Sequence, residues 1–432
     1  MRFLIFFIFI LFISAKPINF SLYKLDSNNP SNKPALLVIS GIQGDEPGGF
    51  NATSILIKHY KVYDGSVWVV PNLNQYSILR NNRGIYGDMN RKFAKLDKSD
   101  PEYQIVQDIK KIILDENVIK ILHLHDGSGF YREDYINNML NQNRWGNCSV
   151  IDQGTLFEYN DLNDNISQVV EYINGNLLDE LHRYRVRNTN TANGDIEQEK
   201  SLTYFATINK KMAFANEASK SLPLNQRVYY HLLSIEGMMK SMNIKFERDF
   251  NLDIKSIDKL INHEDTNIVI NDIIELPLYN IKPVINHFPI QKENIDFYSN
   301  TPIVWLFKDE KNYRIKHGNK NLVYLKPFYT EFDYSLKNVN IIIDNNEIEI
   351  PIGTIISIKD SFEIPPLPYR VNVIGYYKDG VDSEVGIKIK KKDLMDRFSI
   401  DKDNKKYRIE FYKQTKGQKD KFAGMIIVDF KD

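Results

Sequence analysis

The pattern of apolar and polar positions divides the chain into two parts. Between Pro34 and about Asn243, short apolar runs rich in β-branched residues alternate with stretches of helical periodicity. From about Asn251, long helical periodicity disappears, and short alternating runs are separated by Gly, Pro, Asn and Asp. The first pattern is typical of a sheet covered by helices, and the second is typical of all-β domains.

The first part contains five apolar runs that we predict to be β-strands. These runs are residues 35–40, 67–71, 119–125, 148–152 and 211–217. We predict helices over 102–116, whose isoleucines share one face, and over 224–243. We therefore expect an α/β domain with a mixed sheet covered by helices, spanning residues 16–248 of the chain.

The second part is expected to form two smaller all-β domains. The alternating runs predict a small β domain over 249–325 and a β-sandwich over 326–432. His263, His287 and His317 lie in this part, far apart in sequence and without a partner cysteine. We therefore interpret them as ordinary surface or core histidines rather than metal ligands.

Residues 1–15 have the features of a secretory signal peptide. Arg2 precedes an uninterrupted apolar run from Phe3 to Ile13, which is followed by the small residues Ser14 and Ala15. The run is too short to span a bilayer stably, so we expect export to the periplasm and cleavage near Ala15. No stable membrane span would remain after cleavage. An uncleaved anchor is the alternative interpretation.

Composition and charge exclude several classes of partner. The chain has 432 residues, of which 42% are hydrophobic and 26% charged, which is enough for two or three cores. Its 56 basic and 56 acidic side chains cancel, so it has no long-range attraction for nucleic acid or anionic lipid. Cys148 is the one cysteine, which excludes an internal disulfide in an oxidising compartment.

Polar residues follow the carboxyl ends of the predicted strands, where binding sites gather in open α/β sheets. In chain order these residues are Gln43 and Glu46; Arg80, Arg83, Asn90 and Arg91; His123, His125 and Asp126; and Glu217. Because the strands lie far apart in sequence, only the fold can bring these side chains to one edge. Their order along the chain predicts a single site there.

Three of these side chains have the chemistry of an open zinc site. Gln43 and Glu46 lie three residues apart after the first strand, and His125 ends the third strand. Three such ligands leave one position for water. His123 lies on the same strand face as His125 and is the alternative ligand. Taken singly, each residue also has an ordinary structural explanation, as a helix cap or a buried histidine.

Four runs taken in order carry a family resemblance: "GIQGDEPGG", "RGIYGDMNRKF", "LHDGSG" and "FANEAS". Together they resemble the zinc carboxypeptidase superfamily of the carboxypeptidase A type over about residues 34–245. Gln43 in place of the first histidine ligand, the signal peptide and the β-rich C-terminal half are similar to periplasmic peptidoglycan DL-carboxypeptidases that set helical cell shape. That resemblance also implies an immunoglobulin-like last domain.

The resemblance implies a role for each motif residue. It makes Gln43, Glu46 and His125 the ligands of one Zn²⁺ ion, and Glu217 the general base and acid. It makes Arg83 the residue that polarises the scissile carbonyl.

The same resemblance assigns substrate recognition to Asn90 and Arg91, which would grip the terminal carboxylate. A planar guanidinium beside an amide donor is well shaped for a carboxylate. Trp145, in the loop "NRWGN", and Tyr204 are further candidates for the walls of the substrate site.

Glutamine at position 43 is expected to weaken the metal site without abolishing it. Gln43 is neutral, as a ligating histidine is, but an amide oxygen donates less strongly to zinc than an imidazole nitrogen. Its NH₂ group must be held away from the metal by an acceptor. We expect the Gln43→His variant to keep activity and the Gln43→Ala variant to lose metal.

The residues indicate a substrate that is a peptide or amide with a terminal carboxylate. The resemblance implies a more specific function, removal of the terminal diaminopimelate from peptidoglycan tripeptide stems, which leaves dipeptides and influences cell shape. One alternative is a deacylase of the succinylglutamate desuccinylase or aspartoacylase type, against which export argues. The other is a non-catalytic cell-wall binding scaffold, against which the presence of Glu217, Arg83, Asn90 and Arg91 argues. The sequence indicates no protein partner.

Overall fold

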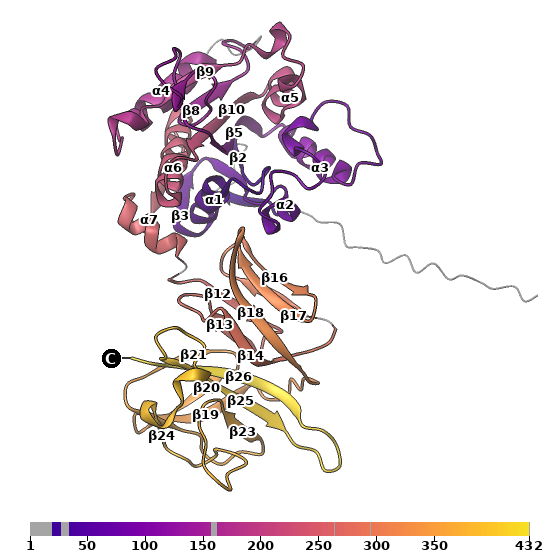
Figure 1. The fold of residues 1–432 in the computed structure, drawn as a ribbon, viewed down its shortest axis with the longest axis vertical. Helices are drawn as coiled ribbons and strands as arrows, with labels where there is room; N and C mark the ends of the chain where they lie inside the picture. The colour runs from indigo at the N-terminus through magenta and orange to yellow at the C-terminus, as the bar shows by residue number, and fades with distance from the viewer. Residues whose placement is uncertain (1–19, 27–33, 157–161, 263, 294, 432) are drawn as a thin grey trace, which may run out of the picture.

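The computed structural model describes residues 20–26, 34–156, 162–262, 264–293 and 295–431 (Figure 1). The predicted signal peptide therefore lies outside the described residues. Within the described ranges, no helix is both long enough and apolar enough to cross a membrane. Figure 1 shows three domains in a row: an α/β domain in indigo to pink, a middle β-domain in orange, and a C-terminal β-domain in yellow.

A seven-stranded sheet forms the centre of the α/β domain. Its strands, in spatial order, are β1 (Tyr23–Asp26), β4 (Ser66–Val70), β2 (Ala35–Ile39), β5 (Val118–Gly127), β10 (Met212–Ser219), β8 (Cys148–Ile151) and β9 (Arg185–Asn188). The pairs β4–β2, β2–β5, β5–β10 and β8–β9 are parallel, whereas β1–β4 and β10–β8 are antiparallel. The predicted mixed sheet is confirmed, and all five predicted strands belong to it.

Helices cover both faces of this sheet. One face carries α1 (Pro47–His59), α4 (Leu162–Asn174) and α6 (Leu224–Ser241), and the other carries α3 (Tyr103–Ile113) and α5 (Leu202–Ile208). Leu36 and Val38 of β2 pack on the first face, and Leu37 and Ile39 on the second. This two-sided burial explains why the central strands are continuous apolar runs in the sequence.

Smaller elements complete the α/β domain. They are α2 (Gln75–Leu79), the 3₁₀ helix η1 (Met89–Arg91), β3 (Tyr60–Asp64) paired with β11 (Lys245–Arg248), β6 (Phe130–Tyr131) paired with β7 (Leu140–Asn141), and α7 (Ile254–Ile261). Helix α7 lies beyond the predicted domain limit at 248, and it packs its Ile257 into the core under α6. The sequence pattern missed α7 because two helical turns give too little periodicity.

The middle β-domain consists of two small sheets. One sheet contains β13 (Ile274–Pro277), β12 (Asn267–Ile270) and β15 (Phe297–Ser299), and the other contains β14 (Val284–Ile290), β18 (Lys320–Tyr329), β17 (Asn312–His317) and β16 (Val304–Asp309). The predicted limit at 325 falls inside β18. Pro327 interrupts the strand pattern in the sequence, but it lies near the end of the strand, where a missing N–H is tolerated.

The C-terminal β-domain is a sandwich of two four-stranded sheets. The first contains β20 (Asn346–Pro351), β19 (Asn338–Ile343), β22 (Ser361–Glu363) and β24 (Ile389–Lys390), and the second contains β21 (Ile355–Ile358), β26 (Lys421–Phe430), β25 (Lys406–Lys413) and β23 (Arg370–Val373). One hydrophobic core runs through this domain and the middle β-domain. The predicted order of an α/β domain followed by two all-β domains is confirmed.

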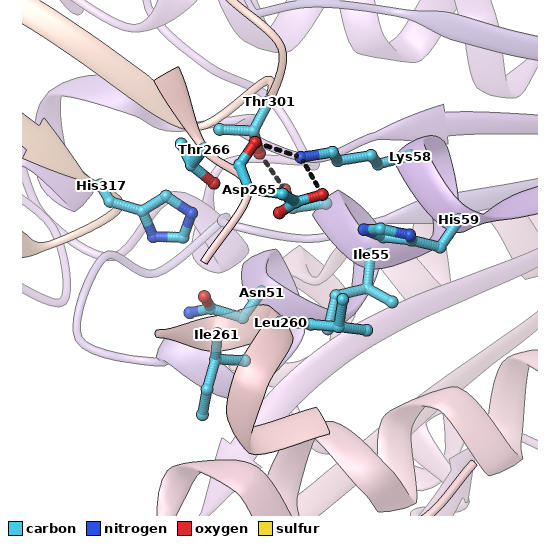
Figure 2. A pocket seen from close by; sticks show the side chains of 11 residues that line it. Asn51, Ile55, Lys58, His59, Leu260, Ile261, Asp265, Thr266, Thr301 and His317 are labelled. Atoms are coloured by element: carbon cyan, nitrogen blue, oxygen red, sulfur yellow. Dashed lines mark hydrogen bonds and ion pairs between the residues drawn. The ribbon is translucent and has the colours of Figure 1, made fainter. Parts of the chain in front are cut away.

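The middle β-domain also packs tightly against the α/β domain. Phe50 and Ile78 form a small apolar cluster with Ile303 and Trp305 across the boundary. Figure 2 shows a nearby cavity between α1, α7 and the middle β-domain, where Lys58 pairs with Asp265. This cavity holds about 10 Å³, roughly the space of one water molecule, so it is a packing defect at a domain contact and not a ligand site.

Candidate active site

The loop between β2 and α1 carries Gln43 and Glu46 at the carboxyl edge of the sheet. A Cβ on Gly44 would lie 2.1 Å from the backbone of Ser77, so only glycine lets this loop rest directly on α2. Pro47 begins α1, where its missing N–H has no cost. Gln43 and Glu46 are 2% and 4% exposed, so the loop buries both side chains.

Three atoms that could bind a metal converge, two from this loop and one from β5. His125 Nδ1 lies 3.0 Å from Gln43 Oε1 and 2.8 Å from Glu46 Oε2. Among the described residues, no group of three His, Cys, Asp or Glu side chains could hold a metal. With the amide oxygen of Gln43, however, the set contains two oxygens and one ring nitrogen, which fits a metal such as zinc with a fourth position open.

Asp88 holds the amide of Gln43 in the orientation that this set requires. Gln43 Nε2 donates to Asp88 Oδ1 at 2.9 Å, which turns Oε1 towards His125. Asp88 Oδ2 accepts from Nε and Nη2 of Arg83 at 3.1 and 2.9 Å. Burial opposes ionisation, but Arg83, Gln43 and the backbone N–H of Asn90 keep the pKa of Asp88 below its ordinary value. The expected acceptor for the NH₂ group is therefore present.

His125, and not His123, faces Gln43 and Glu46. The Nε2 atom of His125 lies 2.8 Å from Nδ1 of His123, behind the converging donors. His123 Nε2 lies in turn 2.7 Å from Oγ1 of Thr203 on α5. Burial, together with the neighbouring His125, lowers the pKa of His123 well below its ordinary value. His123 is therefore a neutral support that fixes the ring of His125.

Glu217 lies beside this cluster on the next strand. It is opposite His125 in the parallel pairing of β10 with β5, so both side chains leave the sheet at the same level. Burial raises the pKa of Glu217 to about 7; His125 opposes this shift, and Glu46 and Asp126 add to it. A carboxylate with this pKa is poised to accept and return a proton near neutral pH.

Arg83, Asn90 and Arg91 come to the same edge from the long loop after β4. Arg83 Nη1 lies 3.5 Å from Glu46 Oε1, and about half of its side chain is exposed. The amide oxygen of Asn90 accepts from the N–H of Leu202 at 3.0 Å. This bond ties the loop to the start of α5 and turns the NH₂ group of Asn90 away from that contact. Arg91 lies on η1, next to Asn90.

Trp145 lies in the loop before β8, and Tyr204 lies on α5. The loop with Trp145 lies against Gly127 at the end of β5, where a Cβ would be 2.5 Å from the carbonyl carbon of Trp145. Tyr204 lies in the first turn of α5, directly after Thr203. Among the described residues, no hydrogen bond joins the Tyr204 hydroxyl to Gln43, Glu46 or His125.

Three charged residues of this edge were not among the sequence candidates. Asp88 precedes Asn90 by two residues, and the need for an acceptor at Gln43 could have pointed to it. Lys220 directly follows β10, and its Nζ lies 3.6 Å from Glu46 Oε1. Arg187 of β9 stacks on Trp145, with its Cζ 3.7 Å from the ring centroid, and no sequence signal connects the two.

The fold and the site together define a metal-dependent hydrolase. A convergent set of metal donors lies beside a glutamate with a raised pKa, at the carboxyl edge of a mixed sheet covered by helices. The chain belongs to the family of carboxypeptidases controlling helical cell shape, whose catalytic-domain model matches residues 4–262. Models of the β-barrel domain and of the "C-terminal domain of metallo-carboxypeptidase" match residues 263–331 and 332–431. The protein is therefore a metallo-carboxypeptidase.

Solved structures agree with this assignment. The apo form of the cell shape determinant protein Csd4 from Helicobacter pylori is 45% identical, covers 96% of this chain and 100% of that chain, and has a TM-score of 0.89. The tripeptide-bound form has the same identity and coverage and a TM-score of 0.88. The mDAP-bound form, described as a D,L-carboxypeptidase, is 46% identical, covers 95% and 100% of the two chains, and has a TM-score of 0.88. No curated protein sequence matches this chain.

Proposed function

We propose that this protein is a zinc-dependent D,L-carboxypeptidase that removes the terminal diaminopimelate from peptidoglycan tripeptide stems. The dipeptide stems that remain would alter the wall and so influence cell shape. The observation that carries this proposal is the convergence of Gln43 Oε1, Glu46 Oε2 and His125 Nδ1 beside Glu217. The tripeptide and mDAP complexes of the Helicobacter pylori protein, which is 45–46% identical, support the choice of substrate.

Gln43, Glu46 and His125 would hold one zinc ion. Bound there, zinc would supply a Lewis acid for the attacking water and the scissile carbonyl. Asp88 would keep the amide oxygen of Gln43, rather than its NH₂ group, turned to the ion. His123 would fix the ring of His125 from behind.

Glu217 would carry the proton through the reaction. Its carboxylate would accept a proton from the attacking water and pass it to the nitrogen of the departing amino acid. Arg83, whose guanidinium is half exposed beside Glu46, would stabilise the negative charge that develops on the carbonyl oxygen. The raised pKa of Glu217 suits both directions of transfer near neutral pH.

Asn90 and Arg91 would bind the terminal carboxylate of the substrate. Because the amide oxygen of Asn90 is engaged by Leu202, its NH₂ group remains as a donor for an anion. Arg91 would add a second donor from the same short helix. Trp145 and Tyr204 would line the substrate site.

The substrate requires export of the enzyme. Peptidoglycan stems lie outside the inner membrane, so we place the mature enzyme in the periplasm after cleavage near Ala15. The deacylase alternative loses its support, because the family model describes carboxypeptidases.

The experiment is a mass measurement on defined muropeptides. Purified mature protein should shorten a tripeptide stem by one diaminopimelate and leave a tetrapeptide stem intact. A chelator should stop the reaction, and added Zn²⁺ should restore it. An unchanged tripeptide together with binding to intact sacculi would support the non-catalytic scaffold instead. Release of succinate from N-succinylglutamate would support the deacylase.

A further inference from the structure

A second, larger cleft lies between the middle and C-terminal β-domains. Its volume is about 1500 Å³, and residues of β14, β18, β23, β25 and β26 line it. Pockets for single small molecules usually measure about 300 to 1000 Å³, so this cleft has the size for an extended ligand. The active site described above shares none of the lining residues.

Glu410 and Tyr412 line this cleft from β25, and a buried ion pair supports them. Arg408 and Glu410 are 4% and 2% exposed, and Arg408 Nη1 lies 3.0 Å from Glu410 Oε1. The Tyr412 hydroxyl donates to Glu410 Oε2 at 2.7 Å. These three residues alternate along β25, so their side chains share one face of the strand. The charge of Glu410 is therefore balanced by Arg408.

The wall opposite Arg408 contains a strained backbone position. His287 has a φ of 49°, which a non-glycine residue rarely adopts, at an irregularity in the pairing of β14 with β18. Arg408 donates to the carbonyl oxygens of Asn286 and His287 at 3.2 and 3.3 Å and so holds this bulge. Strained positions of this kind cluster at binding sites, because the surrounding structure must compensate for their cost.

The charges that line the cleft cancel. The cations are Lys292, Arg370, Lys419 and Lys421, and the carboxylates are Glu293, Glu331, Glu410 and Asp420. Arg370 Nε donates to Asp420 at 2.9 Å, and Lys421 pairs with Glu331 at 2.8 Å. A lining without net charge does not attract a polyanion or a polycation over a distance. It suits a neutral ligand that is rich in hydrogen-bonding groups.

Aromatic and planar side chains supply the contact surface. Phe328 and Tyr329 end β18 with 46% and 38% of their surfaces exposed, although both are large and partly apolar. The guanidinium of Arg370 stacks 4.4 Å from the ring centroid of Tyr412. Flat apolar faces beside amide and guanidinium donors match the two sides of a pyranose ring, which has a C–H face and a rim of hydroxyl groups.

We propose that this cleft binds the glycan backbone of the polymer whose stem peptides the active site shortens. The ligand would be a neutral chain of N-acetylated amino sugars, in which the carboxyl of each muramic acid is consumed by its link to a stem peptide. The choice of this polymer rests on the proposed function, whereas the class of a neutral polar chain rests on the cleft itself. Binding the strand would concentrate its stem peptides at the same molecule.

Calorimetric titration with chitotetraose, a neutral oligomer of N-acetylglucosamine, tests the proposal on the full mature protein. The wild type should bind, and the Phe328→Ser variant should bind about tenfold more weakly, as expected for loss of a central aromatic contact. Tyr298→Ser is the matched control, because Tyr298 is 60% exposed in the same domain and does not line the cleft. The control should bind as the wild type does.

Turnover separates this site from the active site. On free tripeptide, Phe328→Ser and Tyr298→Ser should both match the wild type; on intact sacculi, only Phe328→Ser should raise KM, with kcat unchanged. Failure of the wild type to bind chitotetraose, or equal binding by both variants, would overturn the glycan proposal. If chitotetraose binds but free tripeptide is not cleaved, the proposed function fails and the glycan site stands.

Discussion

The active site and the cleft between the β-domains both place buried charged side chains beside solvent, but they balance charge in different ways. In the active site, burial raises the pKa of Glu217, and the neighbouring carboxylates of Glu46 and Asp126 add to this rise by repulsion. In the cleft, burial also raises the pKa of Glu410, but its carboxylate is paired with Arg408 and accepts from Tyr412, and both contacts oppose the rise. The first cluster retains a repulsion that a cation would relieve, whereas the second contains its own cation. This difference separates a site for a metal reaction from a site for a neutral ligand.

The largest effect should come from removing the charge of Glu217. Glu217→Gln should lower kcat on tripeptide by about 10²- to 10⁴-fold, the contribution typical of a general base. A general base acts in its ionised form, so wild-type activity should rise with pH as Glu217 loses its proton. The midpoint of this rise should lie at or below pH 7, because a bound cation lowers the pKa of Glu217 from about 7. Activity measured from pH 4 to 9 should show this rise for the wild type and not for the variant.

Metal analysis is the control for this variant. Glu217→Gln should bind as much zinc as the wild type, because Glu217 is not one of the three proposed ligands. A variant that keeps wild-type kcat would show that another group carries the proton. A variant that loses both metal and activity would place Glu217 among the ligands.

The next effect tests the ion pair beside the cleft. Arg408→Met alone should destabilise the fold by about 3 to 5 kcal/mol, because it leaves the carboxylate of Glu410 buried without its counter-ion. The double variant Arg408→Met with Glu410→Leu should recover most of that loss, since replacing both partners with apolar groups is often neutral. Urea unfolding of the three proteins measures both differences. A double variant no more stable than Arg408→Met would contradict the pairing.

The third effect concerns the acceptor behind Gln43. Asp88→Ala should weaken zinc binding by about ten- to a hundredfold, because the amide of Gln43 loses the bond that fixes its orientation. Competition with a zinc-sensitive dye measures the affinity. Asp97→Ala is the matched control, because Asp97 is an aspartate in the same loop region whose carboxylate accepts from Ser99. Equal affinities in both variants would show that Gln43 does not depend on Asp88.

The sequence predicted the central sheet well because strands that are buried on both faces appear as continuous apolar runs. The five predicted strands lie within two residues of β2, β4, β5, β8 and β10. The half-exposed strands β1, β3 and β9 were not predicted, because their mixed composition resembles that of loops. The domain limits at 248 and 325 stay predictions: α7 follows the first limit, and the second lies inside β18, where Pro327 interrupts the pattern.

The site was predictable in its residues and not in its geometry. Period-two alternation places His123 and His125 on one face of β5, so the preference for His125 rested on its place at the strand end and on the family resemblance. In the structure, Gln43 and Glu46 of the loop after β2 face His125. The cleft was hidden for a similar reason. In the run "YRIEFY", Arg408 and Glu410 read as the solvent face of an ordinary strand, but both are buried, and Arg408 bonds to the backbone of the middle β-domain. The roles of the predicted site residues stay predictions.

The smallest effect tests whether the active site is independent of the middle β-domain. The tip of the β17–β18 hairpin in the middle β-domain reaches the loop that carries Gln43. Asn319 Nδ2 donates to Asn81 Oδ1 at 2.7 Å and lies 3.5 Å from the carbonyl oxygen of Gly44. Lys316 donates to the carbonyl oxygen of Leu79 at the end of α2. A β-domain element is therefore in direct contact with the metal loop.

Asn319→Ala should lower kcat/KM on free tripeptide by roughly fivefold, since one such hydrogen bond contributes about 1 kcal/mol. Asn321→Ala, an exposed asparagine two residues further along β18, is the matched control and should have no effect. If the two variants behave alike, the hairpin joins the domains without setting the geometry of Gln43. If Asn319→Ala also weakens zinc binding, the middle β-domain is a structural part of the active site.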